Sequence, residues 1–91
     1  MGIEISNITR EIQEQFNLGS ADGVIVVNVA PDSKGAKAGI AKGDVIKEIN
    51  HQPVKDVDDY KAIVKKVDDG ESLYFYIKRM NKGFMVIKVI K

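Results

Sequence analysis

The stretch from Gly23 to Gly39 reads GVIVVNVAPDSKGAKAG and carries the clearest structural pattern in the sequence. Its first part, residues 24–29, is a β-branched run, which predicts a strand buried on both faces and placed at the centre of a sheet. Pro31 and Asp32 break this strand. Ser33 is then suited to cap a single helical turn that ends at Gly39. The stretch therefore predicts a domain built around a sheet.

Further strands and helices are predicted on both sides of this stretch. Ile3 and Ile5 alternate with polar residues, which predicts a strand of about four residues. Thr9 can cap a short amphipathic helix with Ile12 and Phe16 on one face, and Gly19 can end it. The N-terminal part of the chain is thus expected to form one short strand and one short helix.

The C-terminal half predicts three strands and a longer helix. Residues 45–49 form a strand that ends at the turn over 50–53, and residues 73–77 and 84–90 form a hairpin closed by residues 81–83. Asp56 is a good N-cap for a helix over residues 57–67, with acidic residues in its first turn and lysines in its last. Together the elements predict a mostly β (α+β) fold, a partly open barrel or sandwich of about five or six strands capped by two or three helices.

The composition excludes several classes of protein. The chain has 91 residues, of which 44% are hydrophobic and 30% charged, and it contains no cysteine. This length fits one domain over residues 1–91. The formal net charge of +1 gives no reason to expect nucleic acid or an anionic membrane as a partner. No apolar run reaches the ~20 residues of a membrane-spanning helix, and residues 1–5 lack the features of a secretory signal.

The sequence offers little for catalysis. His51 is the single histidine and lies in a polar turn, so a Ser-His-Asp triad would have to use it, and no serine lies in a nucleophile motif. Asp56, Asp58 and Asp59 lack the spacing of a calcium loop and are better explained by helix capping. We expect no catalytic residue, no metal ion and no cofactor in this chain.

Basic and aromatic residues around the last hairpin allow a different interpretation. Residues 78–91 hold several lysines and an arginine near Tyr74, Tyr76 and Phe84. A small nucleic-acid-binding barrel would combine these residue types. The basic residues alternate with apolar ones, however, which is typical of a solvated sheet face. The solvated face is therefore favoured, with the nucleic-acid-binding barrel as the alternative.

The N-terminal strand and the long helix together suggest a binding groove. Gly2 lies between two apolar residues and leads directly into the strand with Ile3 and Ile5. If the helix lies beside the free edge of that strand, an apolar groove forms between Ile3, Ile5, Val57 and Val64. An extended peptide could add to the strand, with backbone N–H groups holding a terminal carboxylate. From the residues alone, the binding groove and the simpler alternative, in which Ile3 and Ile5 complete the core, are equally favoured.

The order of short motifs resembles the PDZ domain family, over nearly the whole chain. The run from Gly23 to Ser33, then residues 36–40 and 42–46, are similar to the family's strand, "SPA"-like turn, "AGL" and "GDxI". Residues 49–54 are similar to its "ING-x-x-V", with His51 in place of the usual glycine, and residues 77–79 to its "V-x-R". Lys34 and Gly35 also depart from the "SPA" pattern.

The short helix before the central strand makes the chain most similar to PDZ domains of HtrA/DegP serine proteases. This resemblance implies a peptide-binding module that is not an enzyme itself. It recognises C-terminal or unfolded apolar segments by strand addition, for substrate tethering or regulation of a serine endopeptidase in bacterial protein quality control. Its partners would be such segments and the protease domain of the parent chain, with no nucleic acid and no membrane insertion, in the periplasm or another extracytoplasmic space. The alternative parents are an intramembrane metalloprotease, a tail-specific protease or a secretion component.

By the same resemblance, specific residues take roles in binding. Those of the carboxylate-binding loop are Met1, Gly2, Ile3 and Glu4, and those of the peptide-pairing strand and groove are Ile5, Ser6, Val57, Lys61 and Val64. We expect an aliphatic pocket for the last ligand residue between Met1, Ile3, Ile5 and Val64. Val57 should favour an apolar residue two before the ligand's end, and Lys61 an acidic neighbour.

Overall fold

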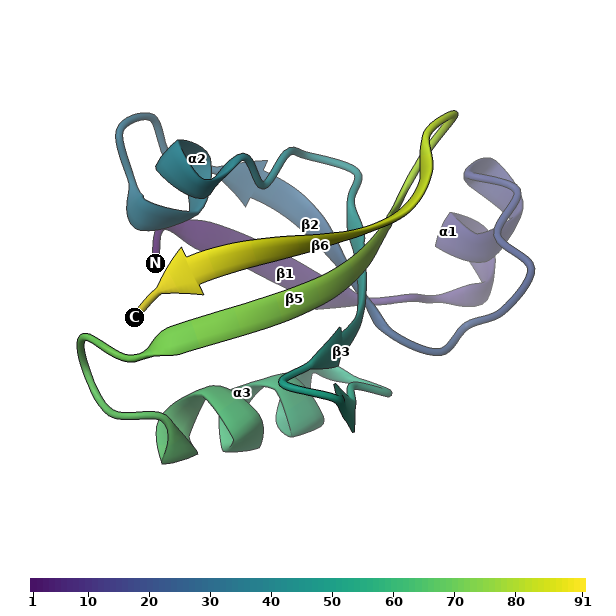
Figure 1. The fold of residues 1–91 in the computed structure, drawn as a ribbon. Helices are drawn as coiled ribbons and strands as arrows, with labels where there is room; N and C mark the ends of the chain where they lie inside the picture. Colours follow the sequence, from purple (N-terminus) through teal and green to yellow (C-terminus); the bar gives the residue numbers. More distant parts are fainter.

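The computed structural model describes all of residues 1–91 and contains one open antiparallel sheet with three helices (Figure 1). In chain order the elements are β1 (Ile3–Asn7), α1 (Arg10–Gln15), β2 (Val24–Val29), α2 (Lys34–Ala38), β3 (Val45–Ile49), β4 (Gln52–Pro53), α3 (Val57–Lys66), β5 (Ser72–Arg79) and β6 (Gly83–Ile90). The six strands follow the order β1-β2-β3-β5-β6, with the short β4 paired to β3 alone. This architecture confirms the predicted mostly β fold with about five or six strands and two or three helices.

The core lies between the sheet and α3. Leu73, Phe75 and Ile77 alternate along β5 and are fully buried, whereas the intervening residues face outward. From the helix side, Tyr60 and Ile63 are buried against them. The rings of Tyr60 and Phe75 meet edge to face with their centroids 6.3 Å apart, a favourable arrangement for an aromatic pair.

The predicted place of β2 is wrong, because β3 is the central strand. β3 pairs with β2 on one side and with β5 on the other, while β2 is second from the sheet edge. Only the first half of β2 is buried on both faces, and Val27 and Asn28 near its end are exposed. The β-branched run predicts a strand along its whole length, but the burial of each residue depends on which elements cover that face of the sheet. The short strand β4 was not predicted either.

The helices begin at the predicted residues. The side chains of Thr9, Ser33 and Asp56 each accept a backbone N–H from three residues further on, which stabilises the first turn. α1 ends before the predicted Gly19, because Asn17 already adopts a left-handed φ of 53°. Asparagine tolerates this conformation better than most residues and so can end a helix as glycine does.

The two termini lie close together at one end of the molecule, and α1 and the β5–β6 turn lie at the other (Figure 1). The molecule measures 37 × 24 × 19 Å along its principal axes. None of the helices has the length and apolar character needed to cross a membrane. The two ends of the molecule are therefore formed by different elements.

Candidate functional site

β1 is an edge strand with a helix beside it. It pairs with β2 along one side only, and α3 lies next to it. At the C-terminal end of β1, the side-chain oxygen Oδ1 of Asn7 accepts the backbone N–H of Val57 at 2.8 Å. This bond joins the strand to the first turn of α3. The strand and the helix are therefore held together at this end.

A hollow of about 660 Å³ opens at the N-terminal end of β1, and we call it the terminal hollow. Its apolar walls come from the chain start and from α3, and its rim carries charges of both signs. The lining residues are Met1, Gly2, Ile3, Asp32, Ser33, Lys34, Tyr60, Val64, Asp69 and Lys91. A concave, partly apolar surface with a few convergent polar groups is the usual form of a ligand site.

The backbone at the start of the chain directs two N–H groups away from the body of the protein. The carbonyl oxygen of Met1 accepts the N–H of Gly35 at 3.0 Å, and that of Gly2 accepts the N–H of Ala30 at 2.7 Å. No peptide bond is cis. In a trans peptide the carbonyl and the following N–H point in opposite directions. The N–H groups of Gly2 and Ile3 therefore point away from α2 and β2 and remain available to an acceptor.

Two glycines make this backbone arrangement possible. Gly2 has a φ of 77°, which L side chains rarely adopt, and a Cβ there would overlap the side chain of Ser33. Gly35 is buried in α2, where a Cβ would lie 2.6 Å from Cγ2 of Ile3 and 3.2 Å from the carbonyl oxygen of Met1. The loop and α2 can approach each other only because both positions lack a side chain.

Tyr60 contributes a polar group to the terminal hollow. The residue is 9% exposed, and none of the side-chain hydrogen bonds within the protein involves its hydroxyl, although no buried side-chain polar atom is left unsatisfied. The hydroxyl therefore reaches solvent. Burial raises the pKa of Tyr60 to about 12, so that the group stays protonated at neutral pH and can donate a hydrogen bond.

Lys91 closes the far side of the same hollow. Its Nζ donates to the carbonyl oxygens of Val64, at 2.8 Å, and Val67, at 2.5 Å. These carbonyls lie at the C-terminal end of α3, where a cation is stabilising, and that of Val64 also accepts the backbone N–H of Val67 at 3.2 Å. The bonds tie the chain after β6 to the end of α3 and hold the helix side of the hollow in place.

The structure brings some of the predicted site residues together at the terminal hollow and places others along the strand and the helix. Met1, Gly2, Ile3 and Val64 line the hollow. Of the others, Ile5 and Val57 are half-buried against the core, Ser6 is half-buried in β1, and Glu4 and Lys61 are exposed.

Other residues that line the hollow were missed. Sequence reasoning gave Tyr60, Lys34 and Lys91 no part in the site. The position of Tyr60 four residues before Val64, and hence on the same helix face, is a signal that could have identified it.

The rest of the molecule shows no arrangement of reactive groups. His51 is exposed in the turn before β4, with a φ of 65°. No group of three or more histidine, aspartate or glutamate side chains gathers where a metal ion could be held. Asp56 and Asp59 serve the start of α3, since their carboxylates accept the backbone N–H groups of Asp59 and Lys55 at 2.9 and 3.0 Å.

Comparison with known proteins gives a consistent result at the level of sequence. Residues 25–79 match the PDZ domain family. The chain is 35% identical over 83 residues to a DegP-like periplasmic serine endoprotease of Rhizobium meliloti (strain 1021), and this match covers 91% of the chain but 16% of that protein. It is 33% identical over 94 residues to the serine protease HhoB of Synechocystis sp., covering 94% of the chain and 23% of that protein. The chain thus spans less than a quarter of the length of these relatives.

Solved structures agree in fold. The structure of the HtrA-type protease AlgW with a decapeptide has a TM-score of 0.86 and 27% identity, and covers 98% of this chain and 27% of that one. The HtrA3 PDZ domain bound to a phage-derived ligand (FGRWV) has a TM-score of 0.84 and 24% identity, and covers 99% of this chain and 81% of that one.

Proposed function

This chain belongs to the PDZ domain family, and we propose that it binds the C-terminal ends of apolar peptides and unfolded segments between β1 and α3. The observation that carries this proposal is the pair of N–H groups on Gly2 and Ile3, which point away from their own protein. Two adjacent backbone donors next to an apolar hollow suit a terminal carboxylate beside an apolar side chain.

Binding would proceed by strand addition. A peptide in extended conformation pairs with the free edge of β1, so that its backbone contributes hydrogen bonds whatever its sequence. Its terminal carboxylate accepts the N–H groups of Gly2 and Ile3, and its last side chain enters the terminal hollow between Met1, Ile3 and Val64. Each hydrogen bond to a charged group contributes about 1.5–3 kcal/mol, which would favour a free C-terminus over an internal segment.

Residues on α3 would set the preference further along the peptide. The half-buried side chain of Val57 offers an apolar contact to the residue two before the ligand's end. Lys61 is exposed one turn further on and would favour an acidic neighbour. Val57→Asp should remove the apolar preference at that position, measured with tails that differ there only. Equal affinity of the unmutated domain for apolar and charged residues at that position would contradict the assignment.

The role of the domain would be to serve a protease that contains it. The relatives are named serine endoproteases, and several are named periplasmic. A protease domain in the parent chain, an extracytoplasmic location, and substrate tethering or regulation in protein quality control follow by analogy with them. A PDZ domain from another kind of parent remains the alternative, and the protein sequence beyond both ends would distinguish the two.

An NMR titration with a peptide ending in Val-Phe-Val tests the binding mode. The free acid should shift signals of Gly2 to Ser6 and Val57 to Val64, and amidation of the same peptide should weaken binding at least about tenfold, the equivalent of one lost hydrogen bond to charge. Binding that ignores amidation would indicate internal segments instead. Salt-dependent binding of an oligonucleotide, with no response to either peptide, would favour the nucleic-acid alternative.

A further inference from the structure

The end of the molecule opposite the terminal hollow has loosely packed apolar side chains. None of the residues of α1 is buried. Ile12, Phe16 and Leu18 are half-buried against a small cluster formed by Ile8, Ile25 and Val45, which is separate from the main core. α1 thus covers this cluster, while its own apolar side chains stay partly exposed.

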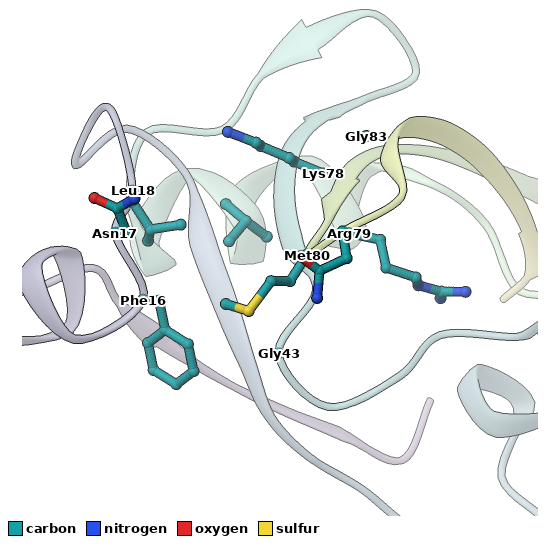
Figure 2. A pocket seen from close by; sticks show the side chains of 10 residues that line it. Phe16, Asn17, Leu18, Gly43, Lys78, Arg79, Met80 and Gly83 are labelled. Carbon is teal, nitrogen blue, oxygen red and sulfur yellow. The ribbon is translucent and has the colours of Figure 1, made fainter.

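Two hollows share Phe16 and Gly43 in their walls, and we call them the Phe16 hollows. The first, of about 320 Å³, lies between the residues after α1 and the β5–β6 turn; its lining residues are Phe16, Asn17, Leu18, Gly43, Val45, Lys78, Arg79, Met80, Asn81 and Gly83. Figure 2 shows Met80 extending from the turn toward Phe16 and Leu18. The second, of about 330 Å³, is lined by Ile12, Phe16, Ile25, Val26, Val27, Lys42 and Gly43.

The charged side chains around the Phe16 hollows are all positive. Lys78 and Arg79 line the first hollow and Lys42 lines the second, while no aspartate or glutamate lines either. The mouths of the two hollows therefore favour anions.

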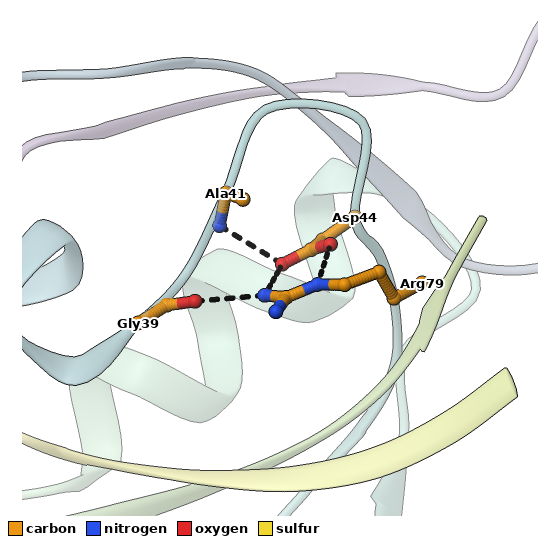
Figure 3. A network of polar contacts seen from close by, with 4 residues as sticks. All are labelled: Gly39, Ala41, Asp44 and Arg79. Atoms are coloured by element: carbon orange, nitrogen blue, oxygen red, sulfur yellow. Dashed lines mark hydrogen bonds and ion pairs between the residues drawn. The ribbon is translucent and has the colours of Figure 1, made fainter. Parts of the chain in front are cut away.

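Arg79 is already used within the protein. Its guanidinium donates two hydrogen bonds to the buried carboxylate of Asp44, at 2.9 and 2.8 Å, and one to the carbonyl oxygen of Gly39 at 2.7 Å (Figure 3). Asp44, which lines a small adjoining hollow, is neutralised by this pair. The cations free to meet a ligand are Lys42, which is exposed, and Lys78, whose Nζ lies 5.9 Å from the centroid of Phe84.

We propose that the Phe16 hollows form a second binding site, for an acidic protein segment that inserts one apolar side chain into each hollow and sets carboxylates against Lys42 and Lys78. The positive rim without any free carboxylate selects the charge of the segment. Two separate hollows that share Phe16 in their walls fit two apolar side chains of one segment better than one compact ligand. Exposed apolar residues at the hollows support this site as well, since Met80 is 49% exposed and Val27 is 38% exposed. The site is independent of the groove between β1 and α3, because it lies at the opposite end of the molecule and uses no backbone donors.

Blocked acidic peptides test this proposal without engaging the groove. The probes are Ac-Glu-Glu-Phe-Glu-Glu-Leu-Glu-Glu-NH2 and versions with one or three glutamates between the apolar residues. Their amidated ends remove the terminal carboxylate. We expect NMR shifts at Phe16, Lys42, Gly43 and Met80 with at least one spacing, none at Gly2, and simultaneous binding of the Val-Phe-Val acid.

Variants that place a carboxylate on an exposed residue give the matched comparison. Lys42→Glu and Met80→Glu place carboxylates at the two hollows and should each weaken binding about tenfold, because they replace attraction and apolar contact with repulsion. Lys55→Glu makes a change of the same charge on an exposed residue that lines neither hollow, and binding should not change.

Several outcomes would overturn the proposal. Equal binding of a version with glutamine in place of glutamate would remove the charge argument. Shifts confined to the groove, or equal weakening by Lys55→Glu, would remove the site. No binding of any probe at millimolar concentration would do the same. Binding of laurate at Phe16 in the absence of peptide binding would assign the hollows to a lipid-like anion instead.

Discussion

The two ends of this domain present apolar concavities of different chemistry. The terminal hollow has two backbone N–H groups directed outward at Gly2 and Ile3, and charged side chains of both signs at its rim. The Phe16 hollows have no carboxylate on their walls and have only lysine and arginine as charged groups. The first arrangement would recognise the end of a chain, because backbone donors can bind a carboxylate whatever the sequence before it. The second would recognise the composition of a segment, because side-chain charges favour acidic residues.

The difference extends to how each end is held together. At the terminal hollow, close backbone packing between the N-terminal loop and α2 fixes the geometry. Beneath the Phe16 hollows, one buried ion pair holds the loop between α2 and β3 against β5. Changes at the two ends should therefore have separable effects, on ligand binding at the first and on stability at the second.

The largest expected effect is the loss of the Asp44–Arg79 pair. Arg79→Met should lower the free energy of unfolding by about 3 kcal/mol, because it leaves a buried carboxylate without its partner, although the side chain of Arg79 is still 27% exposed. The hydrogen bond to Asp44 raises the pKa of Arg79, so that the guanidinium stays charged. Urea unfolding followed by circular dichroism measures the change.

The exposed pair of Arg10 and Glu14 provides the control for this variant. These side chains are 91% and 70% exposed and lie 3.3 Å apart on α1. Arg10→Met should change the free energy of unfolding by less than about 0.5 kcal/mol, as for other surface pairs. Similar losses from both arginine variants would contradict the structural role assigned to the buried pair.

Much of the fold follows from the sequence, and the parts that do not have physical reasons. Thr9, Ser33 and Asp56 were correctly predicted to begin helices, because capping depends on residues a few positions apart. The centre of the sheet was wrong, because strand order depends on pairings between distant residues that the β-branched run of β2 does not contain. The part that Tyr60 has in the terminal hollow was missed, because it depends on where the chain start and Lys91 lie around it.

A second prediction concerns the backbone at the terminal hollow. Gly2→Ala should weaken binding of the Val-Phe-Val acid about 30-fold, or about 2 kcal/mol, because the added Cβ meets Ser33 and the residue must leave its left-handed φ, which rotates the N–H groups. Isothermal titration calorimetry measures the affinity. Gly19→Ala is the matched control, since a Cβ there has no neighbour within 4 Å. Unchanged affinity of Gly2→Ala would separate the loop from carboxylate binding.

Tyr60 gives a third prediction, through pH. Its pKa is raised from 10.0 to about 12, so the neutral phenol is favoured in the folded state. This contribution to stability is complete below pH 10 and is lost as the pH rises toward 12, with a loss of about 1.4 kcal/mol at pH 11. Urea unfolding at pH 8 and pH 11 should therefore show a loss that Tyr60→Phe lacks.

At pH 8 the same variant should be as stable as the unmutated domain, because the hydroxyl has no partner within the protein. Absorbance at 295 nm provides a second measurement, since one of the three tyrosines should titrate late and Tyr60→Phe should remove that step. Three tyrosines that titrate together would show that the ring is more exposed than the structure has it.

The smallest expected effect is at Lys61, a charged residue of α3 beside the groove for the peptide. If this exposed lysine favours an acidic ligand residue beside the position that faces Val57, tails with Glu there should bind about threefold better than tails with Lys, a ratio typical of one screened surface pair. Lys61→Glu should invert the ratio, and 1 M salt should remove it. Lys66→Glu, which lies about 140° further around the helix, should leave the ratio unchanged. If both variants change the ratio equally, the preference comes from the net charge of α3, and charge selection at this end does not depend on a particular contact.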